Sequence, residues 1–202
     1  MKNLVIVAFL VVLGLFFLAC QPQNKENPYS EAKPADSKAA MTKPDSVSRG
    51  ETLSYMMGCH DCHTPKIMTP QGPMLDTTRL LSGHPASDPL PKITYKTMIA
   101  PGHWYLAASD LTAWVGPWGT SFTANLTPDE TGTGNWTFEN FKTALRKGKF
   151  KGLENGRDLL PPMPWQFIRR ASDEDLSYLW QYLRSIKPIK NVVPDALPPV
   201  KM

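Results

Sequence analysis

Two cysteines and a histidine stand close together in the chain, as Cys59, Cys62 and His63 in the pattern Cys-X-X-Cys-His. On a helix, thiols three residues apart lie about one turn apart and can reach the same bound group. Such a pair can form thioether links to the two vinyl groups of one porphyrin, and the histidine that follows can then ligate its iron. The spacing therefore predicts one covalently attached c-type haem, with His63 as the first axial ligand and His60 directed away from the iron.

Two other kinds of site use cysteines at this spacing. A thioredoxin-like dithiol, in which Cys59 and Cys62 would exchange disulfides, needs a preceding strand. Residues 48–57 lack the alternation of a strand and favour a helix. A zinc site would need a second pair of cysteines or histidines, and no such pair follows. Haem attachment is the interpretation that these observations favour.

The second axial ligand is predicted from a stretch rich in proline, where Met163 lies between Pro162 and Pro164. Proline fixes φ, so this loop can hold the flexible thioether of methionine at the iron. The competing interpretations are a core methionine at this position and ligation by Met56, Met57, Met68, Met74, Met98, His84 or His103. With both axial positions filled by His63 and Met163, the iron is suited to electron transfer and not to binding a substrate.

Three helices are expected to position these side chains. The first extends from about Val47 to His60 and brings the two cysteines to the site. The second begins at the N-cap residue Thr137, carries its apolar residues on one face and ends at Gly148. The third begins at Ser172, has an apolar stripe at helical spacing and ends before residue 188.

The chain resembles the class I monohaem c-type cytochromes, and within them the exported bacterial lipoprotein cytochrome c domains that serve as electron-transfer subunits or partners of periplasmic dehydrogenases. The resemblance rests on the stretches 58–65, 125–129, 131–136, 159–165 and 175–185. It implies an all-α fold of helices around one covalent haem. The chain departs from the family in residues 64–124, which are rich in Pro and Trp and are expected to form a long loop insertion.

The resemblance also implies a function. It indicates a protein that is not itself an enzyme and that passes single electrons between a dehydrogenase or respiratory complex and a downstream acceptor. A haem-based peroxidase or a gas-binding protein with a labile sixth ligand is the alternative.

Single residues gain roles from the same resemblance. The first and last helices of such cytochromes cross closely, and Gly50 and Tyr182 are the candidates for that contact. In the family, a Gly-Pro pair after the haem motif accepts a hydrogen bond from the axial histidine. This role falls to the carbonyl of Pro73, with Pro65 as the alternative.

Four tryptophans lie in or beside the insertion, at positions 104, 114, 118 and 136. They either cover the faces and edges of the porphyrin or form an ordinary aromatic core under a long loop. In the first case an indole N–H or the amide of Asn125 would be available to a propionate. The sequence leaves both interpretations open.

The N-terminal residues are predicted to be an export signal and not part of the fold. Residues 1–20 have a basic start, an apolar run and a small residue before Cys20, and so resemble the signal peptides of bacterial lipoproteins, whose cysteine is lipidated. An uncleaved membrane anchor or an ordinary signal peptide is the alternative. The protein is thus expected in the cell envelope, lipid-anchored to a membrane and facing the periplasm.

The remaining boundaries follow from composition. Residues 21–46 are polar and rich in Lys, Glu, Ser and Pro, which predicts a disordered tether. Residues 47–188 are predicted to form the cytochrome c domain, and residues 189–202 a Pro-rich C-terminal tail.

Overall composition and charge limit the function further. The 202 residues include 20 prolines and three cysteines, which suits loop-rich connections and excludes a disulfide-rich scaffold. The net charge of +4 is too mild to indicate a nucleic-acid-binding protein. Residues 142–170, however, carry eight Lys and Arg against two Asp and Glu, so this segment around Met163 is predicted to dock a redox partner with an acidic face. A solvated basic surface is the alternative.

Overall fold

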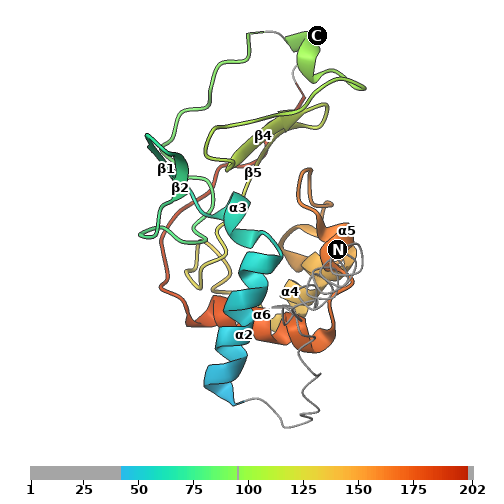
Figure 1. Ribbon diagram of the computed structural model, residues 1–202. Helices are drawn as coiled ribbons and strands as arrows, with labels where there is room; N and C mark the ends of the chain where they lie inside the picture. The colour runs from blue at the N-terminus through green and yellow to red at the C-terminus, as the bar shows by residue number, and fades with distance from the viewer. Residues whose placement is uncertain (1–41, 95, 200–202) are drawn as a thin grey trace, which may run out of the picture. The chain divides into compact units, whose positions relative to one another are not determined.

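The computed structural model describes residues 42–94 and 96–199, whose helices and strands are drawn in Figure 1. The predicted signal peptide, Cys20 and most of the predicted tether lie outside the described residues. Of the helices in the described part of the chain, none has the length and apolarity that crossing a membrane requires.

The described residues contain five α-helices (Figure 1): α2 over Lys43–Met56, α3 over Cys59–His63, α4 over Phe138–Lys147, α5 over Trp165–Ile168 and α6 over Asp173–Ser185. Short 3-10 turns, η1 and η2, cover Lys96–Ile99 and Phe150–Gly152. The single helix expected from Val47 to His60 is divided in two, because Gly58 adopts a left-handed φ of 70° between α2 and α3.

Helices α4 and α6 begin where the sequence predicts. The hydroxyl of Thr137 accepts from the backbone N–H of Asn140 at 3.1 Å, and the side chain of Asn140 accepts from the N–H of Thr137 at 3.0 Å. Helix α4 ends at Gly148, whose φ of 67° is left-handed. Ser172 caps α6 by accepting from the N–H of Asp175 at 2.9 Å. These caps satisfy N–H groups that the first turn of a helix leaves without partners.

Helices α2 and α6 cross closely, which confirms the predicted contact between Gly50 and Tyr182. A Cβ atom at Gly50 would overlap the carbonyl group of Tyr178 and would lie 2.8 Å from the Cβ atom of Tyr182. A side chain at position 50 would therefore force the two helices apart.

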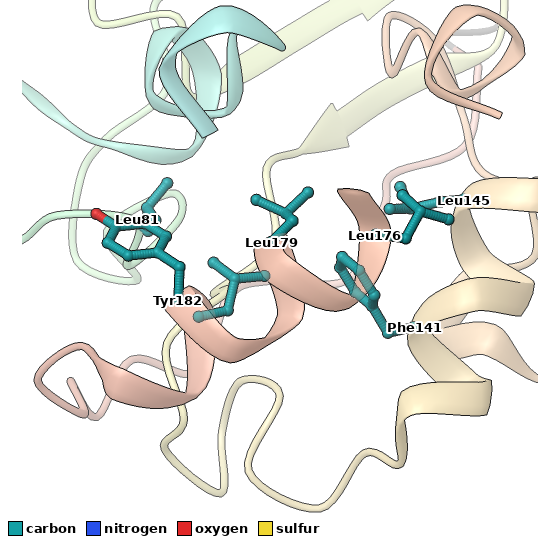
Figure 2. Close-up of a cluster of buried hydrophobic side chains, with 7 residues drawn as sticks. Leu81, Phe141, Leu145, Leu176, Leu179 and Tyr182 are labelled. Atoms are coloured by element: carbon teal, nitrogen blue, oxygen red, sulfur yellow. The ribbon is translucent and has the colours of Figure 1, made fainter. Parts of the chain in front are cut away.

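The buried apolar core lies on α4 and α6 and includes one residue of the insertion. Its members are Leu81, Phe141, Leu145, Leu176, Leu179, Tyr182 and Leu183, and Figure 2 labels six of them. Cys59 and Met163 are partly buried, and both pack against this core. Because Leu81 is fully buried, the insertion takes part in the core and does not only cover it.

The insertion is not a plain loop, and the expected all-α fold is wrong. Two antiparallel sheets occur in it (Figure 1): β1 over Lys66–Thr69 with β2 over Gly72–Leu75, and β3 over Leu106–Ala107 with β4 over Ala113–Gly116 and β5 over Gly119–Phe122. Trp114, Val115, Thr120 and Phe122 have the β-branched or aromatic side chains that favour strands. Gly119, with a φ of 98°, closes the tight turn between β4 and β5.

The residues after α6 run back along the insertion. The backbone groups of Leu197 and Thr120 exchange two hydrogen bonds, of 2.9 and 3.0 Å. The side-chain amide of Asn191 donates to the carbonyls of Ser82 and His84, at 2.7 and 2.8 Å. The segment after α6 thus helps to hold the insertion in place.

Candidate functional site

The Cys-X-X-Cys-His residues form one short helix. Gly58 turns the chain out of α2, and α3 then spans the five residues of the motif before Thr64 returns to extended backbone. Cys59 and Cys62 lie about one turn apart on α3, and neither forms a disulfide. Both sulfur atoms are therefore available for bonds to a bound group.

The two thiols are poorly suited to disulfide exchange. Burial raises the pKa of Cys59 to about 12 and also raises the pKa of Cys62. Exchange requires the thiolate, which these groups hardly form at neutral pH. This disfavours the dithiol alternative. Within the residues that the structure describes, no three His, Cys, Asp or Glu side chains converge as a metal site.

His63 is buried, and one hydrogen bond fixes its ring. Nδ1 donates to the carbonyl oxygen of Ala124 at 2.7 Å. Because a carbonyl only accepts, Nδ1 carries the proton. Burial lowers the pKa of His63, which keeps the imidazole neutral and leaves a lone pair on Nε2. This is the tautomer that can ligate haem iron through Nε2.

The acceptor for His63 is not the residue that the sequence predicts. Pro73 lies on β2 with its side chain exposed. The carbonyl of Pro65, the alternative, accepts instead from the backbone N–H of Asp76 at 2.9 Å. The Gly-Pro pair belongs to a hairpin whose strands pair with each other, so the acceptor comes from Ala124, at the far end of the insertion.

His60, between the two cysteines, is engaged on both ring nitrogens. Its Nε2 lies 3.1 Å from the hydroxyl of Ser54, and its Nδ1 lies 3.1 Å from the hydroxyl of Thr64. The ring stacks on Tyr55, with centroids 4.1 Å apart. Burial lowers the pKa of His60 to about 4. His60 therefore connects α2 to α3 and has no free nitrogen for a metal.

Met163 lies on the same core as the first cysteine of the motif. Its side chain is partly buried against the cluster that Cys59 also contacts. Its backbone N–H donates to the carbonyl of Leu160 at 3.4 Å, and the carbonyl of Pro161 accepts from the hydroxyl of Ser121 at 2.6 Å. Ligation by Met163 stays a prediction, and its position against this core supports it.

The competing ligands are differently placed. Met56, Met68, Met74, Met98 and His103 are exposed. His84 is buried, with Nδ1 2.7 Å from the hydroxyl of Thr112 and its ring 4.8 Å from that of Phe122. Of these competitors, only Met57 shares with Met163 a place against the core.

Three residues of one short segment, residues 121–124, are not singled out by the sequence. Ala124 acts through its backbone carbonyl, which no side-chain pattern reveals. Ser121 binds the loop that carries Met163. Thr123 holds the one buried side-chain polar atom, among the described residues, without a hydrogen-bond partner. An unpartnered buried hydroxyl next to the residue that holds His63 fits a site completed by a bound polar group, such as a haem propionate.

Three of the groups that the sequence offers to a propionate, those of Asn125, Trp114 and Trp118, are used within the protein. The side-chain amide of Asn125 donates to the carbonyl of Ile189 at 2.8 Å, and its oxygen accepts from the N–H of Thr127 at 3.0 Å. The indole N–H groups of Trp114 and Trp118 donate within the insertion. These residues therefore shape the loops around the site.

A hollow of about 300 Å³ lies elsewhere in the insertion. It is lined by residues 90–94, Met98, residues 106–108, residues 113–115 and Thr120. None of the motif residues on α3 borders it, so it is separate from the candidate haem site.

Parts of the chain are similar to cytochrome subunits of dehydrogenases. It is 39% identical over 90 residues to the cytochrome c subunit of a quinone-type alcohol dehydrogenase of Gluconobacter oxydans, which covers 43% of this chain and 18% of that subunit. It is 31% identical over 121 residues to the fructose dehydrogenase cytochrome subunit of Gluconobacter japonicus, covering 51% of this chain and 24% of that one. It is 28% identical over 152 residues to the gluconate 2-dehydrogenase cytochrome c subunit of Pantoea cypripedii, covering 74% of this chain and 25% of that subunit.

These similarities support a c-type cytochrome. The chain spans no more than a quarter of the length of these curated relatives. No protein-family model matches the chain.

Proposed function

We propose that the chain is a c-type cytochrome of the electron-transfer kind, with one haem attached through Cys59 and Cys62. The observation that carries the proposal is the geometry of α3. Two unpaired thiols lie one turn apart on this helix, and the next residue is a neutral histidine whose free nitrogen can ligate iron. The similarity to cytochrome c subunits agrees with it.

His63 and Met163 are the axial ligands in this proposal. A bound haem supplies one-electron chemistry at the iron. The carbonyl of Ala124 holds the imidazole of His63 in one orientation, and the turn from Leu160 holds Met163. The core side chains around Cys59 and Met163 exclude water from this side of the site. A haem iron held by both His63 and Met163 would favour electron transfer over substrate turnover, so the proposal assigns the chain no enzyme activity of its own.

The electron donor is a dehydrogenase, in keeping with the names of the similar subunits. The docking partner presents an acidic face to the segment around Met163. In this segment Lys142 and Arg146 pair with Asp173, Lys147 pairs with Glu154, and Lys149 pairs with Asp158. Lys151, Arg157, Arg169 and Arg170 are exposed and, among the described residues, form no ion pair. These four cations can steer an acidic partner.

The protein is exported and lipid-anchored in the cell envelope through Cys20. Support comes from the basic start, the apolar run and the small residue that precede this cysteine. Replacing Cys20 with Ser should release the protein from the membrane fraction.

A redox titration in the presence of a small iron ligand tests the proposed function. The purified protein should titrate as a single one-electron centre, and its reduced form should not bind carbon monoxide, because both axial positions are filled. Met163→Ala should bind carbon monoxide, whereas the control Met68→Ala, at an exposed methionine, should not. Rapid binding of carbon monoxide by the unmodified protein would contradict the assignment.

A further inference from the structure

We propose that Ser121 is a positioning residue for Met163, and that the sheet of the insertion joins the two segments that carry the axial ligands. This inference rests on the proposed function, because it concerns how firmly Met163 is held at the iron. In this inference the β3–β5 sheet holds the methionine loop in position, which neither the apolar core nor the Cys-X-X-Cys-His motif does.

The bond from Ser121 to the methionine loop has a defined direction. Ser121 lies on β5 with 8% of its surface exposed, and its hydroxyl donates to the carbonyl of Pro161 at 2.6 Å. The indole N–H of Trp118 donates to the same hydroxyl at 3.3 Å. Because the indole only donates and the carbonyl only accepts, the hydroxyl proton must point to Pro161. Pro161 is two residues before Met163.

The same segment of chain reaches the other ligand. Three residues after Ser121, the carbonyl of Ala124 accepts from Nδ1 of His63 at 2.7 Å. Thr123, which precedes Ala124, accepts from the N–H of His84 at 3.0 Å through its backbone carbonyl. The residue before His84, Gly83, donates to the carbonyl of His63 at 2.8 Å, so this segment is linked to His63 a second time. In extended backbone three residues span about 10 Å. Residues 121–124 therefore form a short bridge between the two ligand segments.

The prolines alone do not fix the place of Met163. They restrict φ within the loop, but they do not determine where the loop sits relative to α3. Before Met163 the loop is tied by Leu159, whose N–H donates to the carbonyl of Gly148 at 2.7 Å. Nearer to Met163, the hydrogen bond from Ser121 connects the loop to residues 121–124, which also bind His63.

Strand β5 is a firm support for such a bond. It pairs with β4 along one edge, where Ser121 lies opposite Trp114. Next to Ser121, Thr120 exchanges two backbone hydrogen bonds with Leu197 on the other edge. A site held by a strand with neighbours on both sides is more precise than a site held by a free loop.

Imidazole binding to the oxidised protein tests this inference, because imidazole competes with Met163 for the iron. Losing one hydrogen bond from a side-chain hydroxyl to a carbonyl corresponds to a change of about 2- to 10-fold in the equilibrium between bound and released methionine. Ser121→Ala should therefore bind imidazole about 2- to 10-fold more tightly than the unmodified protein. Its thioether-to-iron absorption band should weaken in the same preparation. Ser121→Thr keeps the hydroxyl and should restore both properties.

Ser82→Ala is the matched control. Ser82 is also a buried serine whose hydroxyl donates to a backbone carbonyl, but this carbonyl is that of Arg79, at 2.9 Å, and does not belong to the methionine loop. Its imidazole affinity should equal that of the unmodified protein. Trp118→Phe removes the indole donor to Ser121 together with part of the ring that packs near Tyr105, and it should give a smaller change in the same direction as Ser121→Ala.

The outcomes separate this inference from the function on which it rests. If the purified protein carries no covalent haem, the proposed function is overturned, and this inference with it. If haem is attached and Met163→Ala loses the thioether band, but Ser121→Ala and Ser82→Ala bind imidazole equally, the inference alone is overturned. Tighter binding in Ser121→Ala, absent in Ser82→Ala and reversed in Ser121→Thr, supports it.

Discussion

The helices and the insertion contribute to the site in different ways. Helices α4 and α6 form most of the buried core, α2 crosses α6, and α3 presents the two cysteines and His63. The insertion adds one core residue, Leu81, but it supplies the backbone carbonyl that orients His63 and the hydroxyl that binds the methionine loop. The comparison indicates that the helices determine stability and the insertion determines the geometry of the ligands.

The largest expected difference is in unfolding free energy, between a variant of a buried core residue on α6 and a variant of an exposed residue in the insertion. Leu179→Ala, in the core on α6, should lower the free energy of unfolding by about 2–5 kcal/mol because it leaves a cavity. Trp104→Ala removes a larger side chain from the insertion, but that side chain is 70% exposed, so the change should stay within about 0.5 kcal/mol. Urea unfolding followed by circular dichroism measures both. Equal losses of unfolding free energy in the two variants would contradict the conclusion that the helices determine stability.

Glycine substitutions sharpen the same comparison. Gly50→Ala places a Cβ atom against the backbone of α6 and should cost about 1–3 kcal/mol of unfolding free energy. Gly102, in the insertion, has nothing within 4 Å of such an atom, so Gly102→Ala should show only the strain of its φ of 82°, about 1 kcal/mol. Thermal unfolding of the two variants side by side gives the difference. A milder effect at Gly50 than at Gly102 would show that α2 and α6 do not cross this closely.

A pH series tests whether His60 is held neutral in the folded protein. His60 joins α2 and α3, and burial lowers its pKa from 6.5 to about 4 in the folded protein. Below pH 6.5 the unfolded chain binds a proton that the folded chain does not, so the free energy of unfolding should fall as the pH drops from 6.5 towards 4.

Urea titrations across that range measure the effect of His60. The slope should become shallower in His60→Gln. An unchanged slope in His60→Gln would mean that the imidazole is not held neutral between α2 and α3.

The smallest expected effect concerns the start of α4. Thr137→Ala removes the acceptor for the N–H of Asn140 and should cost about 1 kcal/mol of unfolding free energy. Thr137→Ser keeps the hydroxyl and should cost much less. The same urea measurements apply, and equal losses in the two variants would exclude the hydroxyl as the cause.

The contrast between the regions also explains what the sequence could predict. Thr137, Gly148 and Ser172 act within a few residues of their own helix, so local patterns find them. The contact between Gly50 and Tyr182 could be predicted from the family resemblance, because the two helices that cross there are shared by the family. In both cases the signal lies in side-chain type and spacing.

The insertion offered no such signal. The hairpin over residues 66–75 removes Pro73 from the site, and the acceptor of His63 is a backbone carbonyl that any residue could provide at Ala124. Ser121 meets Pro161 across forty positions of sequence, a pairing that neither periodicity nor spacing encodes. The strands overturned the all-α expectation because the resemblance covers the helices on both sides of the insertion and not the insertion itself.

The central claim, covalent attachment of one haem through Cys59 and Cys62, is tested most directly by the intact mass of the purified, denatured protein. The unmodified protein should exceed the mass of its processed chain by one haem. The double variant Cys59→Ala, Cys62→Ala should show the mass of the chain alone. A bare chain in the unmodified protein, or haem retained in the double variant, would contradict the account.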